Sequence, residues 1–219
     1  MNAIIFDTET TGVKEPEIVE AAWVQVASPK NLQHLQQFSR LYKPSKPIEC
    51  GAMATHHIRD LDVERCSPSS TFKLPAFANY IVGHNIDYDW GAVGSPPVKR
   101  ICTLALSRFL WPSADSFSLG ALIYHVHESA ARQILKNAHS AMADVKATTY
   151  LLQFIIEALP HIETWEDLWG HSEAARLPTI MTFGKWKGTP LKDVPYDYVS
   201  WLLKQPDLEP YLERALQAL

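Results

Sequence analysis

A short apolar run near the N-terminus, ending in two acids, restricts the fold of this chain more than any other feature. Residues 3–6 are apolar and are followed by Asp7 and Glu9. Such a run, closed by the turn residues 10–12, predicts a buried central strand. Because side chains alternate along a strand, Asp7 and Glu9 are expected on one side of the chain at the strand's end. Taken alone, this pair is more typical of solvent-facing or turn-capping acids than of metal ligands.

The segments after this strand predict a mixed α/β sheet flanked by helices. A long helix is predicted over residues 141–159, because apolar residues recur there at helical spacing behind a candidate N-cap, Ser140. The other expected elements are strands over residues 18–27, 35–42, 80–83 and 100–102, helices over 103–110 and 119–126, weak helical character over 51–65, and a polar surface connection over 67–75.

The chain is predicted to divide into one medium-sized domain and a small C-terminal module. Residues 1–159 form the larger part, which is long enough to bury a full core. Residues 160–178 are expected to be a linker with one or two short helices. The module, residues 179–219, begins with a glycine-bounded turn at 183–188 and continues with an amphipathic helix at 196–204 and a final helix.

The composition is that of an ordinary globular protein, without a sign of a membrane span or of secretion. Apolar residues make up 47% of the chain, but no run of eighteen of them occurs. The first residues, Met1 to Asp7, lack the basic and long apolar regions of a signal peptide. Cys50, Cys66 and Cys102 fit no CxxC pattern and are predicted to be reduced thiols, so a cytoplasmic location is expected.

The net charge is mildly negative, at −4 from 20 Lys and Arg and 24 Asp and Glu. A protein that coats long stretches of nucleic acid normally carries a basic footprint, which this chain lacks. Any contact with nucleic acid is therefore expected to be small and local, as suits an enzyme that grips an end.

A second polar cluster follows the predicted strand 80–83 and contains His84, Asn85, Asp87 and Asp89. In isolation, His84 and Asn85 are typical of residues that satisfy backbone groups at a strand-to-helix corner. The two aspartates are typical of a first helical turn, where they stabilise the helix dipole.

A third cluster lies at the start of the predicted long helix. His139 precedes the candidate cap, and Asp144 follows one turn into the helix among small residues. An aspartate on the inner side of an apolar helix is costly unless a cation compensates its desolvation. A purely structural hydrogen bond between His139 and Asp144 is an equally good interpretation of this segment alone.

The three clusters taken together favour a metal site. Four convergent carboxylates repel one another unless divalent cations neutralise them. Hard oxygen ligands select Mg²⁺ or Mn²⁺ over Zn²⁺. Two such ions, typically about 3.5–4 Å apart, form the clamp that is used for phosphodiester hydrolysis.

These motifs resemble, in order and position, those of a known nuclease family. The segments 6–12 (FDTETTG), 84–89 (HN followed by YD) and 139–144 (H and D five apart) resemble the three exonuclease motifs of the DEDDh family. This is the family of the DnaQ-like proofreading exonucleases. The likeness covers about residues 3–157.

The resemblance implies an RNase H-like fold and a metal-dependent 3′→5′ exodeoxyribonuclease. Such an enzyme releases 5′-mononucleotides from DNA ends, and DNA repair is its expected role. Two ions, Mg²⁺ or Mn²⁺, are the implied cofactor, and DNA with a 3′ end is the implied partner. The residues to which the resemblance assigns roles are Asp7, Glu9, Asp89 and Asp144 as metal ligands, His139 as general base, and Thr10, Thr11, His56, His84 and Asn85 as substrate contacts.

Further segments extend or depart from the family pattern. Residues 100–112 and 182–188 resemble one DNA-degrading branch of the family. Tyr88 replaces the usual Phe, so its hydroxyl needs a partner. His57 and Arg59 stand where the family usually has Gly and Thr, which affects the pocket for the terminal base.

Two alternatives to a DNA exonuclease stay open. The first is an RNA 3′-exonuclease of the same family, because the choice of sugar depends on a few contacts to the 2′ position. The second is a non-catalytic DNA-end or polymerase-partner module that keeps the fold. The sequence indicates no protein partner and no oligomeric state.

The C-terminal module offers a further candidate contact with DNA. Lys185, Trp186 and Lys187 bring positive charge and an aromatic ring together in the glycine-bounded turn, which suits phosphate binding or base stacking. A solvated hairpin in which Trp186 belongs to a local core is an equally good interpretation.

Overall fold

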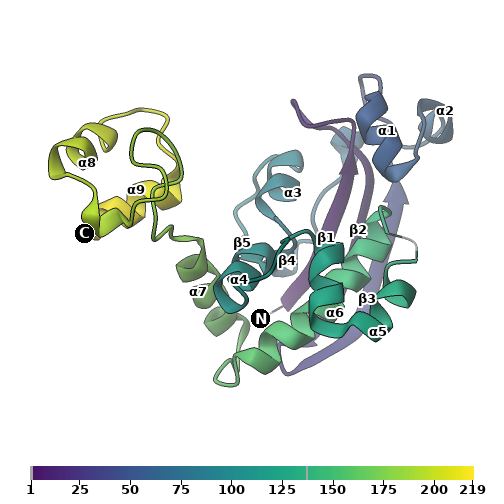
Figure 1. The fold of residues 1–219 in the computed structure, drawn as a ribbon. Helices are drawn as coiled ribbons and strands as arrows, with labels where there is room; N and C mark the ends of the chain where they lie inside the picture. The colour runs from purple at the N-terminus through teal and green to yellow at the C-terminus, as the bar shows by residue number, and fades with distance from the viewer. Residues whose placement is uncertain (1, 137) are drawn as a thin grey trace. The chain divides into compact units, whose positions relative to one another are not determined.

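The computed structural model describes residues 2–136 and 138–219 and divides the chain into two compact units (Figure 1). The first unit ends at Ser172, and the second runs from Glu173 to Leu219. Met1, the first residue of the predicted larger domain, lies outside the described residues. Among the helices of the described residues, none is both long and apolar enough to cross a lipid bilayer.

The first unit is built on a mixed sheet of five strands in the order β3-β2-β1-β4-β5. The N-terminal strand is central, as predicted, and it pairs antiparallel with β2 and parallel with β4. β3 extends the sheet antiparallel beside β2, and β5 extends it parallel beside β4. The strands are β1 (Asn2–Thr10), β2 (Ile18–Ser28), β3 (Asn31–Leu41), β4 (Ala78–Gly83) and β5 (Lys99–Cys102).

Helix α6 covers the centre of this sheet. It packs against β1 and β2, while α4 and α5 pack against α6 (Figure 1). Its apolar residues Val145 and Leu152 are fully buried, as the helical spacing of the apolar residues requires. Ser140 is the N-cap, as predicted, and accepts a hydrogen bond from the N–H of Ala143 at 3.4 Å. The helices of this unit are α1 (Cys50–His56), α2 (Asp60–Val63), α3 (Asp87–Ala92), α4 (Thr103–Leu110), α5 (Leu119–Ile134) and α6 (Ala141–Ala158).

The connection over residues 67–75, between α2 and β4, is largely exposed, as predicted, but one of its residues enters the core. A short 3₁₀ turn at Ser69–Thr71 precedes Phe72, which is buried. The Phe72 ring stacks on Phe6 with 5.9 Å between the ring centroids. Burying a side chain of this size stabilises the fold by about 2–3 kcal/mol, which is enough to direct a polar loop inward.

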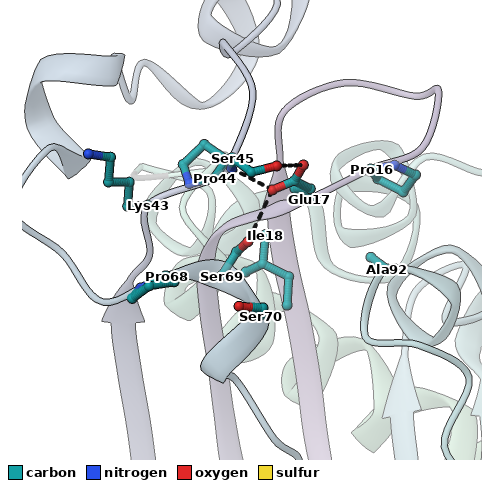
Figure 2. Close-up of a pocket in the computed structure, with 10 residues that line it drawn as sticks. All are labelled: Pro16, Glu17, Ile18, Lys43, Pro44, Ser45, Pro68, Ser69, Ser70 and Ala92. Carbon is teal, nitrogen blue, oxygen red and sulfur yellow. Dashed lines mark hydrogen bonds between the residues drawn. The ribbon is translucent and has the colours of Figure 1, made fainter.

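An acid just before β2 holds two loops of the first unit together (Figure 2). The Glu17 carboxylate accepts hydrogen bonds from the N–H and the hydroxyl of Ser45, both at 2.6 Å, and from the hydroxyl of Ser69 at 3.2 Å. Burial alone would raise the pKa of Glu17, but these hydrogen bonds lower it. The three residues line a surface hollow of about 600 Å³ together with Lys43 and Pro68. They fix the segment that follows directly on the acids of β1.

The segment predicted as a linker, residues 160–178, contains a long helix, α7 (Trp165–Arg176). The first part of α7 belongs to the first unit, where Trp165 and Ser172 are buried. The Ser172 hydroxyl accepts a hydrogen bond from the N–H of Cys102 at 2.8 Å. The boundary between the compact units therefore falls inside the segment, and the functional assignment of the two parts stays a prediction.

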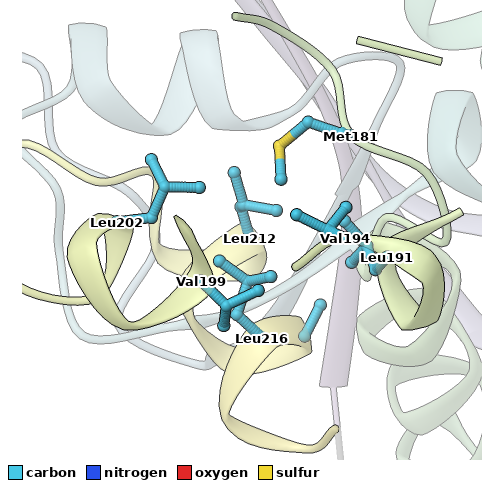
Figure 3. Close-up of a cluster of buried hydrophobic side chains, with 8 residues drawn as sticks. Met181, Leu191, Val194, Val199, Leu202, Leu212 and Leu216 are labelled. Atoms are coloured by element: carbon cyan, nitrogen blue, oxygen red, sulfur yellow. The ribbon is translucent and has the colours of Figure 1, made fainter. Parts of the chain in front are cut away.

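The second unit has a small apolar core of its own. Figure 3 shows its side chains pointing toward one another from a looped segment and from two helices, α8 (Tyr196–Leu202) and α9 (Pro210–Gln217). Trp186 is partly buried and packs against this core. The buried residues are Met181, Leu191, Val194, Val199, Leu202, Leu212, Ala215 and Leu216.

Candidate active site

Two acids at the end of β1 form the centre of the candidate site. Asp7 and Glu9 are two positions apart on a strand, so both project from the same face of the sheet. On the neighbouring strand, Asp7 lies opposite Ala22 and Glu9 lies opposite Glu20. The small alanine side chain leaves room beside the Asp7 carboxylate. A shift of register directly after Glu9 ends the regular pairing, and such bulges re-aim side chains at the ends of strands.

Helix α6 brings a third acid to this face. Asp144 lies in its first turn, and carboxylate oxygens of Asp7, Glu9 and Asp144 all lie within 4.8 Å of one another. His139 lies just before the helix, is exposed, and has a left-handed backbone with φ 69°. The backbone N–H of His139 donates to Oδ1 of Asp144 at 3.4 Å. The structure therefore brings the residues of the first and third sequence clusters together.

Helix α3 supplies a fourth acid, Asp89, which is only 4% exposed. Its Oδ1 accepts hydrogen bonds from the N–H of Thr8 at 2.9 Å and from the Thr8 hydroxyl at 2.6 Å. Its charge acts directly on Asp7. Asp87, two residues earlier, forms an ion pair with Arg100 instead. The structure thus places Asp89, and not Asp87, with the acids of β1.

Burial and mutual repulsion raise the pKa of all four carboxyl groups. For Asp7 the pKa lies well above its usual range, first because of burial and then because of the charges of Asp89 and Asp144. Burial and neighbouring acids raise the pKa of Glu9 to about 8. Burial raises the pKa of Asp89 to about 7, although the hydrogen bonds from Thr8 oppose the shift. Burial likewise raises the pKa of Asp144. Oxygen ligands at this spacing, with this much uncompensated negative charge, can hold a divalent metal ion.

A fifth acid, Glu20, borders the site, although it belongs to none of the three sequence clusters. Its side chain accepts hydrogen bonds from the N–H of Ala141 at 3.0 Å and from the Ser39 hydroxyl at 3.3 Å. Its charge adds to the effect of burial in raising the pKa of Glu9. A carboxylate at a helix N-terminus is stabilised by the helix dipole, so Glu20 fixes the start of α6 beside His139. The only signal in the sequence is the register that places Glu20 opposite Glu9, and register depends on the tertiary fold.

Several residues expected to contact the substrate also shape the segment after β1. The Thr11 hydroxyl accepts a hydrogen bond from the N–H of Glu17 at 3.1 Å. The Thr10 hydroxyl donates to the carbonyl of Gly12 at 3.3 Å and is hydrogen-bonded to the Tyr88 hydroxyl. The Tyr88 hydroxyl lies 3.0 Å from the same carbonyl. The Tyr88 hydroxyl, which the family's usual Phe lacks, therefore has hydrogen-bond partners.

The His56 side chain is buried between the end of β1 and the end of α1. Its Nδ1 accepts a hydrogen bond from the N–H of Ile58 at 3.0 Å, so Nε2 carries the proton and donates to the carbonyl of Thr10 at 3.2 Å. Burial lowers the pKa of His56, which keeps the imidazole neutral at neutral pH. His57 has a left-handed backbone with φ 61°, a conformation that favours glycine, which is the residue the family usually has here.

His84 and Asn85 lie at the corner between β4 and α3. Nδ1 of His84 lies 3.0 Å from the Thr103 hydroxyl, and its Nε2 donates to the carbonyl of Phe117 at 2.9 Å. Burial lowers the pKa of His84. Asn85 is exposed, with a left-handed backbone (φ 63°), and its carbonyl accepts from the N–H of Tyr88 at 3.0 Å. The structure thus gives both residues a role at the corner, and their role as substrate contacts stays a prediction.

Comparison with known families identifies the class of protein. Residues 4–152 match the family model RNase_T, which is described as an exonuclease. This range contains the four clustered acids and His139, and it spans more than half of the chain. The chain therefore belongs to this exonuclease family.

Two relatives show which members of this family the chain resembles. Exodeoxyribonuclease 10 of Escherichia coli strain K12 is 31% identical over 220 residues, which cover 97% of this chain and 96% of the relative. A solved structure of exonuclease X in complex with 5′-overhanging duplex DNA matches with a TM-score of 0.61 and 28% identity, covering 77% of this chain and 99% of that one. The predicted likeness to a DNA-degrading branch of the family, based on residues 100–112 and 182–188, is confirmed by these two relatives.

A third comparison supports the fold alone. The structure of E. coli exonuclease I in complex with a dT13 oligonucleotide matches with a TM-score of 0.60 at 20% identity, covering 82% of this chain and 46% of that one. Together with the mixed sheet and its flanking helices, these matches confirm the predicted RNase H-like fold.

The raised pKa values make the stability of the metal-free protein depend on pH. An unfolded chain releases carboxyl protons near pH 4, whereas the folded protein retains those of Glu9 up to about pH 8. Ionising Glu9 in the folded state therefore costs stability, and this cost grows as pH rises between these two values. In EDTA, Glu9→Gln is expected to be more stable than the parent at pH 8, and this difference is expected to be much smaller at pH 5 and absent near pH 4.

Chemical denaturation of both proteins at these pH values measures this difference. The buried His56 and the half-buried His84 titrate alike in both proteins, so their effects cancel in the comparison. Addition of Mg²⁺ at pH 8 is expected to stabilise the parent and to reverse the order, because the cation neutralises the acids. A Glu9→Gln variant that is less stable than the parent in EDTA at pH 8 would contradict this account of the site.

Proposed function

We propose that this chain is a metal-dependent 3′→5′ exodeoxyribonuclease that hydrolyses the last phosphodiester bond of a DNA strand and releases 5′-mononucleotides. The observation that carries the proposal is the convergence of Asp7, Glu9 and Asp144 from distant segments, with Asp89 buried beside them. The relationship to exodeoxyribonuclease 10 over almost the whole length of both chains supports DNA as the substrate.

The proposed cofactor is a pair of Mg²⁺ or Mn²⁺ ions held by Asp7, Glu9, Asp89 and Asp144. The donor set fits such ions, because every ligand is a hard oxygen and the carboxyl groups carry raised pKa values that a cation would relieve. Bound ions of this kind lower the pKa of water and stabilise negative charge on the attacked phosphate and the leaving oxygen.

His139 is the proposed general base. It lies at the start of α6 beside Asp144, and its imidazole is exposed, so it can reach a water molecule at the acid cluster. An imidazole accepts protons near neutral pH, which suits the removal of a proton from the attacking water. The hydrogen bond from Ala141 to Glu20 holds the start of the helix in place behind it.

The 3′-terminal nucleotide is proposed to lie against the end of β1. Thr10, Thr11 and His56 form one side of this place, and His84 and Asn85 lie at the corner that leads to Asp89. Because Thr10 and His56 are hydrogen-bonded to neighbouring groups, we propose that they shape and orient the contact surface. The module residues Lys185, Trp186 and Lys187 are proposed as additional contacts with the DNA.

A cytoplasmic location and a role in DNA repair complete the proposal. The three cysteines of the chain are free thiols, which is the usual state in a reducing compartment.

End-labelled oligonucleotides provide the test of substrate and direction. With Mg²⁺, the purified protein is expected to shorten DNA from its 3′ end, to release 5′-mononucleotides and to cut matched RNA at least tenfold more slowly. Faster cleavage of the RNA would favour an RNA 3′-exonuclease, because the choice of sugar depends on contacts to the 2′ position. Release of nucleotides from the 5′ end would exclude both enzymes. Tight binding of DNA ends without hydrolysis in either Mg²⁺ or Mn²⁺ would favour the non-catalytic module.

A further inference from the structure

A tight glycine turn in the second unit lies directly against an aromatic side chain. Gly184 has φ 70°, and a Cβ added there would lie 2.7 Å from the Tyr198 hydroxyl. Only glycine therefore allows the turn both its left-handed backbone and this close approach. The contact places the turn that contains Lys185 beside Tyr198 of α8.

Helix α8 presents a pair of aromatic rings at this place. Tyr198 and Trp201 are one turn apart on the helix, and their ring centroids lie 5.5 Å from each other at 37°. Trp201 is 53% exposed. A tryptophan that is half exposed on a unit of this size, supported from behind by a second ring, offers a flat apolar surface to solvent.

Two lysines bring positive charge to the turn beside these rings. Lys185 and Lys187 are both exposed, and residues 177–192 contain no acid. Lys185 lies over the ring of Trp186, with 5.4 Å between its Nζ and the ring centroid. Asp197, which precedes Tyr198 in the first turn of α8, accepts a hydrogen bond from the N–H of Tyr198 at 2.9 Å.

We propose that this surface is a second nucleic-acid site, which binds single-stranded DNA by stacking a base on Trp201 and by placing its phosphates beside Lys185 and Lys187. The proposal rests on the proposed function, because it gives the nuclease a place to hold the strand apart from the acid cluster. Trp201 is the stacking residue in this assignment, and Tyr198, which packs against the core, supports its ring. Trp186 packs against the core of the unit and supports Lys185.

Single-stranded DNA fits this surface better than other partners do. Its unpaired bases have exposed faces that stack on aromatic rings without a requirement for sequence, whereas the bases of a duplex are already stacked. Its phosphates match the two lysines of the turn. An acidic peptide would form ion pairs with the lysines but would offer no flat ring system to stack on Trp201.

Binding by the full chain in EDTA tests the proposal, because chelation silences the nuclease and leaves the acid cluster repulsive to DNA. The probe is a fluorescein-labelled strand of about 20 thymidines, long enough for several bases to stack. Trp201→Ala is expected to weaken binding about tenfold, and Trp201→Phe to restore most of the loss. The matched control is Tyr196→Ala, because Tyr196 lies on the same helix and is 85% exposed, but lines a different hollow with Leu191 and Leu203.

The salt dependence of DNA binding tests the role of the two lysines. The double substitution Lys185→Gln and Lys187→Gln is expected to reduce the slope of log affinity against log salt by about 1.4, because two fewer phosphates release counterions on a single strand. Circular dichroism of each variant checks that the second unit stays folded.

Two outcomes overturn the proposal: equal affinity of the folded Trp201→Ala variant and the parent, or an equal loss in Tyr196→Ala. Its failure is distinct from failure of the proposed function. If the parent degrades DNA from the 3′ end but substitution of Trp201 leaves strand binding unchanged, only the proposal of a second site is wrong. If the parent has no nuclease activity but its strand binding depends on Trp201, only the proposed enzymatic function is wrong.

Discussion

Replacing Asp7 with asparagine is expected to abolish DNA hydrolysis, with a loss in kcat on the order of 10⁴-fold or more, while the protein remains folded. Asp7 lies centrally, within reach of Glu9 and Asp144 and in direct electrostatic contact with Asp89. Its loss therefore removes a ligand from the proposed metal site. The same change removes one source of repulsion, so the metal-free variant is expected to be more stable than the parent at pH 8.

Steady-state cleavage of a labelled strand in Mg²⁺ measures the first effect, and thermal unfolding in EDTA measures the second. Asp87→Asn is the matched control, because Asp87 has the same charge, lies two residues from Asp89 and is ion-paired with Arg100. Its activity is expected to stay within about threefold of the parent. If Asp87→Asn were inactive and Asp7→Asn active, the assignment of the acids to the site would be wrong.

Replacing His139 with alanine is expected to lower kcat by about 10²–10⁴-fold, with little change in the affinity for metal or DNA. The carboxylates hold the ions in the proposed mechanism, whereas the imidazole only moves a proton. The rate of the parent enzyme should rise through the pH range in which imidazoles lose a proton, and this rise should be absent from the variant. A pH–rate profile under single-turnover conditions measures both, since it separates chemistry from product release.

His84→Ala provides the control for the histidine assignment. His84 also lies beside a motif aspartate, but both of its ring nitrogens are hydrogen-bonded, to Thr103 and to Phe117. Its loss should disturb the corner between β4 and α3 and reduce the rate at every pH. The pH dependence should remain. Loss of the pH-dependent rise in His84→Ala, together with its retention in His139→Ala, would assign the general base to His84.

The elements with strong local signals could be predicted from the sequence. The apolar run of β1, the cap Ser140 and the apolar spacing of α6 are local patterns, and the structure has these elements within a few residues of the expected bounds. The acids mark the ends of these elements, so their convergence follows once the strand is central and the helix covers it.

The features that the sequence did not indicate depend on tertiary contacts. Helix α5 continues to Ile134, beyond the predicted end at residue 126, across a kink at His127 in a polar stretch where apolar spacing fades. Phe72 is buried because it packs against Phe6, which is distant in the sequence. Glu20 reaches the site only through the pairing of β2 with β1, which no local pattern fixes.

The position of α6 in the chain has a consequence for protein synthesis. A nascent chain that has exposed β1, β4 and α3 already carries Asp7, Glu9 and Asp89, but Asp144 and His139 arrive only when α6 leaves the ribosome and packs on the sheet. In the proposed assignment of the site, an unfinished chain therefore lacks one metal ligand and the general base until α6 has packed on the sheet.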